Sequence, residues 1–137
     1  MMTREAYATA IMGFIWVIIA IPALALDLNS FRAQHGRPAL SVSASLSALA
    51  YQQANSMASR TQLDHKDFRK RIGAMIGTAH AENVSYGCED EDCAIQQWAR
   101  SGGHRANMLR SDVSAYGIAS ATGDNGKRYW ALELGGD

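Results

Sequence analysis

The sequence predicts an α+β fold for the part of the chain that follows its first 25 residues. Three observations support this prediction. Apolar residues with helical spacing come first, a short alternating segment and further helical segments follow, and two alternating segments around an Asn-Gly pair end the chain. This order differs from the regular strand-helix alternation of a doubly wound parallel sheet. The 137 residues, 47% hydrophobic and 19% charged, fit one globular domain, which we place at residues 26–137.

The N-terminal segment has the composition of an export signal. The 17 residues from Ala10 to Leu26 carry no charge, which is shorter than the roughly 20 residues that cross a bilayer. Ala23, Leu24 and Ala25 form the small-x-small pattern that signal peptidase accepts. We therefore predict a cleaved signal peptide over residues 1–25 and a secreted protein, extracellular or periplasmic. An uncleaved anchor is the alternative, and it would be the protein's sole contact with a membrane.

Export also bears on the two cysteines, Cys88 and Cys93, in "CEDEDC". An oxidising compartment favours a disulfide between them. Because the closed loop is short, this bond would stabilise the fold by only about 2 kcal/mol. Zinc bound by these sulfurs and two further ligands is the alternative. We interpret the acidic residues between them as a solvated turn.

Helical segments are expected at four places. Residues 26–35 precede Gly36 and Pro38, which end a short helix. A second helix, from Ser43 to about Arg60, carries one apolar stripe, and a third lies within residues 66–77. We interpret its "RKR", residues 69–71, as solvated surface. A fourth helix, capped by Asp92 and ended by residues 101–103, carries Ile95, Trp98 and Ala99.

Strands are expected in two regions. Val84 and Tyr86 alternate in "AENVSYG", and the strand should stop at Gly87. Residues 115–122 and 127–134 flank "GDNG", which predicts a hairpin whose turn has positive φ at both Asn125 and Gly126. The second hairpin strand should have one buried and one wetter face. The buried face would hold Trp130, Leu132 and Leu134, and the wetter face Tyr129, Ala131 and Glu133.

Charge and motifs exclude several functions. Basic and acidic residues number 13 each and the basic ones are mostly scattered, so we expect no nucleic-acid partner. The sequence has no HExxH, GxSxG, phosphate-loop or Rossmann pattern. A site must therefore be assembled from distant segments. The candidates are His65 in "LDHKDF", Glu82 in "HAENVSYG" and His104 in "GHRANML".

The order of these segments resembles the CAP superfamily of cysteine-rich secretory proteins, antigen 5 and pathogenesis-related proteins, and is most similar to its short bacterial branch. The resemblance rests on "LNSFRAQHGRPAL", "DH", "AENVSYG", a following tryptophan, "SGGHRANML", "YGIA" and "YWALELGG", and it covers residues 27 to 135. It implies a three-layer α-β-α sandwich with a central, mainly antiparallel sheet. It also implies an open cleft lined by two histidines and two acids.

By motif, His65 and His104 would be the histidines and Glu82 the first acid, with Asn83 bracing the loop. The second acid of the family pattern falls at position 101, which is a serine in this chain. We interpret Ser101 as a helix end and not as a nucleophile. Asn107 is expected to bond backbone, and His80 could approach the cleft because it shares a strand face with Glu82.

Two imidazoles and one carboxylate permit two different chemistries. They form a ligand set that can hold zinc, or a similar divalent cation, with one position open for water. The same trio can instead be a hydrogen-bonded cluster that ties loops together without a metal.

Three functions therefore stay open. The leading one is a monomeric binding module for a lipid, a sterol or another small or envelope ligand, since such binding is known within the family. The second is a metal-assisted extracellular hydrolase, and the third is a structural or interaction domain.

Overall fold

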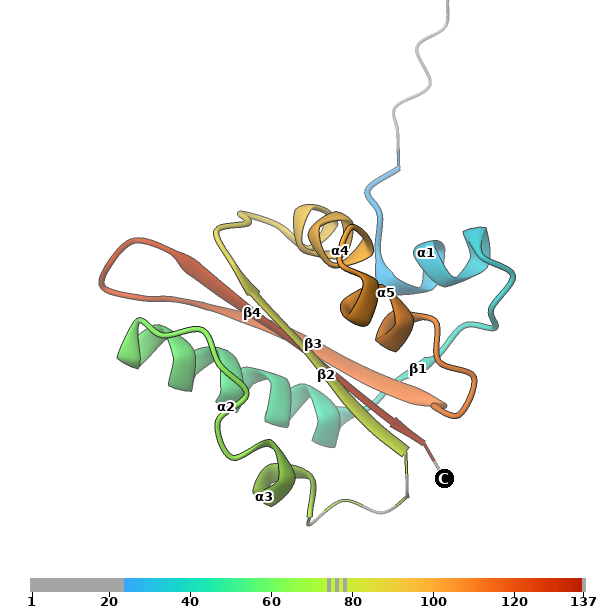
Figure 1. The fold of residues 1–137 in the computed structure, drawn as a ribbon, viewed down its shortest axis with the longest axis horizontal. Coiled ribbons are helices and arrows are strands. Elements are labelled where there is room, and N and C mark those ends of the chain that lie inside the picture. Colours follow the sequence, from blue (N-terminus) through green and yellow to red (C-terminus); the bar gives the residue numbers. More distant parts are fainter. Residues whose placement is uncertain (1–23, 74, 76, 78, 137) are drawn as a thin grey trace, which may run out of the picture.

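The computed structural model describes residues 24–73, 75, 77 and 79–136 (Figure 1). The predicted signal peptide lies almost entirely outside these residues, so its cleavage after Ala25 stays a prediction. Within the described ranges, no helix is both long and apolar enough to cross a membrane.

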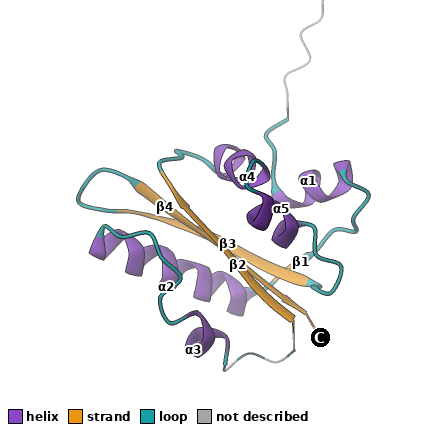
Figure 2. Ribbon diagram, viewed as in Figure 1, coloured by secondary structure: helices purple, strands orange, loops and turns teal. Residues whose placement is uncertain are grey.

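A four-stranded mixed sheet forms the middle layer. Its strand order is β1-β3-β4-β2; the short β1 pairs parallel to β3, and the longer pairings are antiparallel. One face carries α1, α4 and α5, and α2 covers the other with α3 beside it (Figures 1 and 2). The predicted α+β sandwich with a mainly antiparallel sheet is confirmed. The elements are α1 (Leu28–Gln34), β1 (Ser41–Val42), α2 (Ala44–Arg60), α3 (Phe68–Ile72), β2 (Ala79–Tyr86), α4 (Glu91–Ala99), α5 (Gly102–Met108), β3 (Ala115–Thr122) and β4 (Arg128–Gly136).

Each face of the sheet packs against its own apolar cluster. On the first face, Trp98 of α4 and Met108 of α5 are buried with Leu132 of β4. On the second face, Met57 of α2 is buried with Ala131. Both faces of β4 are therefore covered, and the predicted wetter face is wrong. Tyr129, Ala131 and Glu133 are buried because α2 lies over them.

The predicted end of α1 and both predicted ends of α2 are confirmed, whereas α1 begins at Leu28, two residues after its predicted start. Asp27 caps α1, and Gly36 follows it with φ of 69°. Ser43 caps α2 by accepting a hydrogen bond from the backbone N–H of Leu46 at 3.3 Å.

The boundaries of α4 and α5 differ from those predicted. Asp90, not Asp92, caps α4: its extended backbone lets Oδ1 accept from the N–H of Cys93 at 2.9 Å. The acidic segment is thus largely a helix start, where negative charge is favourable. Ser101 occupies the N-cap position of α5, and the two glycines after it begin that helix instead of ending α4. Burial of Met108 in the core offsets their weak helix propensity.

The β3–β4 hairpin and the disulfide are confirmed, but the turn differs in detail. Within this described loop only Gly126 has positive φ, 75°, and its N–H donates to the carbonyl of Gly123 at 2.9 Å. Asn125 stays out of the left-handed region, and its side chain accepts from the N–H of Lys127 at 3.1 Å. This is a turn followed by one left-handed glycine.

A disulfide joins Cys88 to Cys93, with 5.4 Å between their Cα atoms, so zinc at these sulfurs is ruled out.

One glycine sets how closely α2 approaches the sheet. A Cβ on Gly117 of β3 would collide with the backbone of Leu46 and Ser47. Gly117 lies opposite Glu133, which lies opposite Glu82 on β2. The three residues form a row on the α2 face, since directly paired residues point to the same side. The start of α2 thus packs directly on β3, while two carboxyl groups lie further along the row, towards the β2 edge.

Candidate functional site

The structure brings two of the predicted site residues into direct contact. His65 lies in the loop between α2 and α3, and Glu82 lies in the middle of β2. Their atoms Nδ1 and Oε1 are 2.7 Å apart. The histidine side chain is 52% exposed, whereas that of Glu82 is 1% exposed. The pair therefore joins an exposed ring to a buried carboxylate.

Arg71 engages the second oxygen of Glu82. Its Nη2 lies 2.6 Å from Oε2 of Glu82, and its Nη1 donates to Oε1 of Glu133 at 2.6 Å. The Arg71 side chain is only 7% exposed, so the interpretation of residues 69–71 as solvated surface is wrong at this position, although Arg69 and Lys70 are exposed. The reason is that its guanidinium reaches the buried carboxyl groups of Glu82 and Glu133 on the sheet.

Glu133 is the site residue that the sequence reasoning missed. Burial raises its pKa to about 9, and the hydrogen bond and charge of Glu82 act in the same direction, with Arg71 opposing them. Glu133 is therefore protonated at neutral pH. Its signal in the sequence was a lone acid inside the apolar strand "YWALELGG", a position that hydrophobic alternation alone had assigned to solvent.

We name these four side chains, His65, Glu82, Arg71 and Glu133, the carboxylate array. In this arrangement both oxygens of Glu82 are engaged, one by an imidazole and one by a guanidinium. No three His, Cys, Asp or Glu side chains in the described part of the chain are grouped so that they could hold one metal ion. His65, Glu82 and His104 are therefore not grouped as one ligand set in this structure, and metal binding by them stays a prediction.

Asn83 connects β2 to α5. Its Nδ2 donates to the backbone oxygen of His104 at 2.9 Å, and its Oδ1 accepts from Nδ2 of Asn107 at the same distance. Nδ2 of Asn107 also lies 3.4 Å from the Glu82 carbonyl, the backbone bond that the sequence suggested. Asn83 is fully buried, so these bonds fix α5 relative to the strand that carries Glu82.

His104 lies on a separate cavity at the edge of β2, with a volume of about 220 Å³. Burial lowers the pKa of His104, and the charge of His65 lowers it further, so the ring is neutral at pH 7. Position 101, where the family resemblance expects an acid, also lines this cavity, and Ser101 leaves it without that charge. We call it the His104 cavity; its walls are Leu63, Val84, Ser85, Tyr86, Gln97, Trp98, Ser101 and His104.

His80 does not line the His104 cavity. Its Nε2 lies 3.3 Å from the carbonyl oxygen of Gly77, at the start of β2. The predicted site residues thus divide into two groups: His65 and Glu82 belong to the carboxylate array, and Ser101 and His104 line the cavity.

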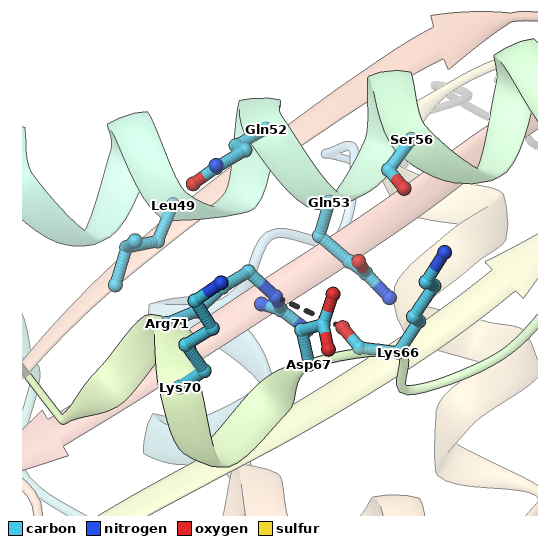
Figure 3. Close-up of a pocket in the computed structure, with 8 residues that line it drawn as sticks. All are labelled: Leu49, Gln52, Gln53, Ser56, Lys66, Asp67, Lys70 and Arg71. Atoms are coloured by element: carbon cyan, nitrogen blue, oxygen red, sulfur yellow. Dashed lines mark hydrogen bonds between the residues drawn. The ribbon is translucent and has the colours of Figure 1, made fainter.

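A second cavity, of about 250 Å³, lies between α2 and α3 (Figure 3). Polar and charged groups dominate its walls, including Lys66, Asp67 and Lys70. Nε of Arg71 donates to the backbone oxygen of Lys66 at 3.3 Å, which ties the helix to the loop before it. None of the predicted site residues lines this cavity.

Comparisons with known proteins agree with this architecture. A family model described as "Cysteine-rich secretory protein family", or CAP, matches residues 27–134. No curated protein sequence matches the chain significantly.

Three bacterial structures are similar in fold. An outer surface protein of Borrelia burgdorferi has a TM-score of 0.71 at 15% identity, and the match covers 80% of this chain and 86% of that one. An extracellular protein containing an SCP domain from Bacillus anthracis has a TM-score of 0.69 at 20% identity, over 80% of this chain and 38% of the other. A cysteine-rich secretory protein from Staphylococcus aureus has a TM-score of 0.65 at 21% identity, over 80% and 36%. At these identities the similarity establishes the fold alone.

Proposed function

The chain belongs to the cysteine-rich secretory protein (CAP) family, and from that membership we propose that it is a binding module that holds a small, mostly apolar ligand in the His104 cavity. One observation carries the proposal. The cavity residues include exposed apolar side chains, Leu63 and Tyr86, at 41% and 42% exposure. Exposed apolar groups at the mouth of a concave site are typical of ligand binding.

We also propose a location for the protein. We propose that it is secreted, because the disulfide suits an oxidising compartment and two of the similar structures are described as an extracellular and a secretory protein. The intact mass of the exported protein should correspond to a chain that begins at Leu26, and retention of the first 25 residues would contradict cleavage.

Toluene, a small apolar compound, is expected to bind the His104 cavity saturably. The binding can be followed by the methyl NMR signals of Leu63 and Val84. Leu63→Asp should weaken it by about 10-fold or more, because a charge at the mouth must lose water when the ligand enters. Val42→Asp is the matched control, since Val42 is exposed on β1 and does not line the cavity. Absence of saturable binding to the unmodified protein would contradict the proposed function.

The metal-assisted hydrolase is the second candidate, and zinc titration separates it from the first. We expect calorimetry to show no stoichiometric binding at micromolar protein, because zinc would have to displace Arg71 from Glu82. Stoichiometric binding that disappears in both His65→Ala and His104→Ala would favour the hydrolase instead.

A further inference from the structure

Two residues in the wall of the His104 cavity each have a buried polar side-chain atom without a hydrogen-bond partner. The residues are Ser85 and Trp98, which are 4% and 0% exposed. Neither Oγ of Ser85 nor Nε1 of Trp98 has a partner among the described residues. By contrast, Nε1 of Trp130 donates to the backbone oxygen of Cys88 at 2.8 Å. A buried donor without a partner lowers the stability of the fold by about 1–3 kcal/mol. Two such donors at one cavity are therefore unusual in a folded protein.

The chemistry of the serine hydroxyl and the indole N–H indicates which kind of ligand atom could bond to both. An indole N–H can only donate, and a serine hydroxyl can donate to the same acceptor. Both residues lie on neighbouring elements, Ser85 near the end of β2 and Trp98 near the end of α4. A single oxygen with two lone pairs, such as a carbonyl oxygen, can accept from both.

The charge of the walls decides between a neutral and an anionic oxygen. The eight described wall residues include no lysine, arginine, aspartate or glutamate. The remaining wall groups are apolar or uncharged polar side chains and the imidazole of His104. Lys127 lies over the ring of Tyr86, with Nζ 4.6 Å from the centroid, but it is not a wall residue. A carboxylate held at Ser85 and Trp98 would therefore lose its water without a counter-charge in the wall, which is costly. An ester or amide carbonyl avoids that cost.

We propose that the His104 cavity recognises a neutral carbonyl compound, an ester or an amide. Once the neighbouring atoms that cover Nε1 of Trp98 and Oγ of Ser85 move aside, its oxygen accepts hydrogen bonds from both. The apolar part of the ligand lies against Leu63 and Tyr86, the exposed apolar side chains of the wall. This inference rests on the proposed function, because it names the ligand class of the same cavity.

Benzamide, benzoate and toluene test the proposal, because they share one ring and differ in the attached group. Each is titrated into ¹⁵N-labelled protein, and the indole N–H signal of Trp98 is followed after assignment with Trp98→Phe. We expect benzamide to shift that signal saturably and to bind about 10-fold more tightly than benzoate or toluene. The backbone N–H signal of Val42 should stay in place and report an intact fold, since Val42 lies on β1 and does not line the cavity.

Ser85→Ala provides the matched variant, because it removes one hydroxyl and leaves the shape of the strand unchanged. It should weaken benzamide binding about 5- to 10-fold and leave toluene binding unchanged. Equal affinity for toluene and benzamide, or tighter binding of benzoate, would overturn the carbonyl proposal while the cavity remained a binding site. Binding of none of the three compounds would overturn both the carbonyl proposal and the proposed function.

Discussion

Replacing Arg71 with alanine is expected to lower the free energy of unfolding by about 3–5 kcal/mol, the usual effect of removing one partner of a buried ion pair. Arg71 is the cation of the carboxylate array, lying between Glu82 and Glu133 on the α2 face of the sheet. Without it, the remaining partners of Glu82 are the half-exposed His65 and the carboxyl group of Glu133. The measurement is urea denaturation at pH 7.

Arg69→Ala is the matched control for this prediction. Arg69 lies on the same helix and is exposed, so its loss should change stability by no more than about 0.5 kcal/mol. Arg71→Met combined with Glu82→Gln should recover part of the loss, because the double variant leaves no unpaired buried charge. Equal, small effects of the Arg71 and Arg69 variants would show that the array does not stabilise the fold.

The second large effect concerns pH. The pKa of Glu133 is raised to about 9 in the folded protein, whereas an unfolded chain has an ordinary value near 4.3. Between these values the folded state keeps a proton that the unfolded state has lost. The free energy of unfolding should therefore fall as pH rises from about 5 to 9, by at most about 1.4 kcal/mol per pH unit. Below pH 4 and above pH 10 this contribution to the slope should vanish.

Glu133→Gln should remove that slope, because the amide cannot ionise, and the variant should be more stable than the unmodified protein at pH 8. Glu89→Gln is the control, since Glu89 is exposed on the loop after β2. Denaturation curves at one-unit pH intervals measure the difference. Parallel pH profiles for the Glu133 variant and the unmodified protein would contradict the protonated, buried state of Glu133.

Periodic patterns predicted the elements well, because helix and strand periods are local properties of the chain. The α2 stripe and the β3–β4 hairpin follow from spacing within a few residues. The second buried face of β4 could not be read in this way, because it exists only where α2, far away in sequence, covers the strand. Asp90, and not the predicted Asp92, caps α4. Spacing alone does not show which of two neighbouring acids caps a helix.

The candidate site was predictable only in part. Motif order selected His65, Glu82 and His104 as candidates, but it did not predict that they would divide between the carboxylate array and the His104 cavity. The burial of Arg71 could not be predicted, because it follows exposed basic residues in the sequence. Its partner Glu133 lies 62 positions further along the chain. The unpartnered groups of Ser85 and Trp98 have no sequence signal at all, because such residues normally find partners when they fold.

The most direct test of the account is a crystal structure of the protein with benzamide bound. We predict that the amide oxygen lies about 3 Å from both Nε1 of Trp98 and Oγ of Ser85, with the ring against Leu63 and Tyr86. Benzamide bound instead in the polar cavity between α2 and α3, or in the His104 cavity with its oxygen turned away from Trp98, would contradict it.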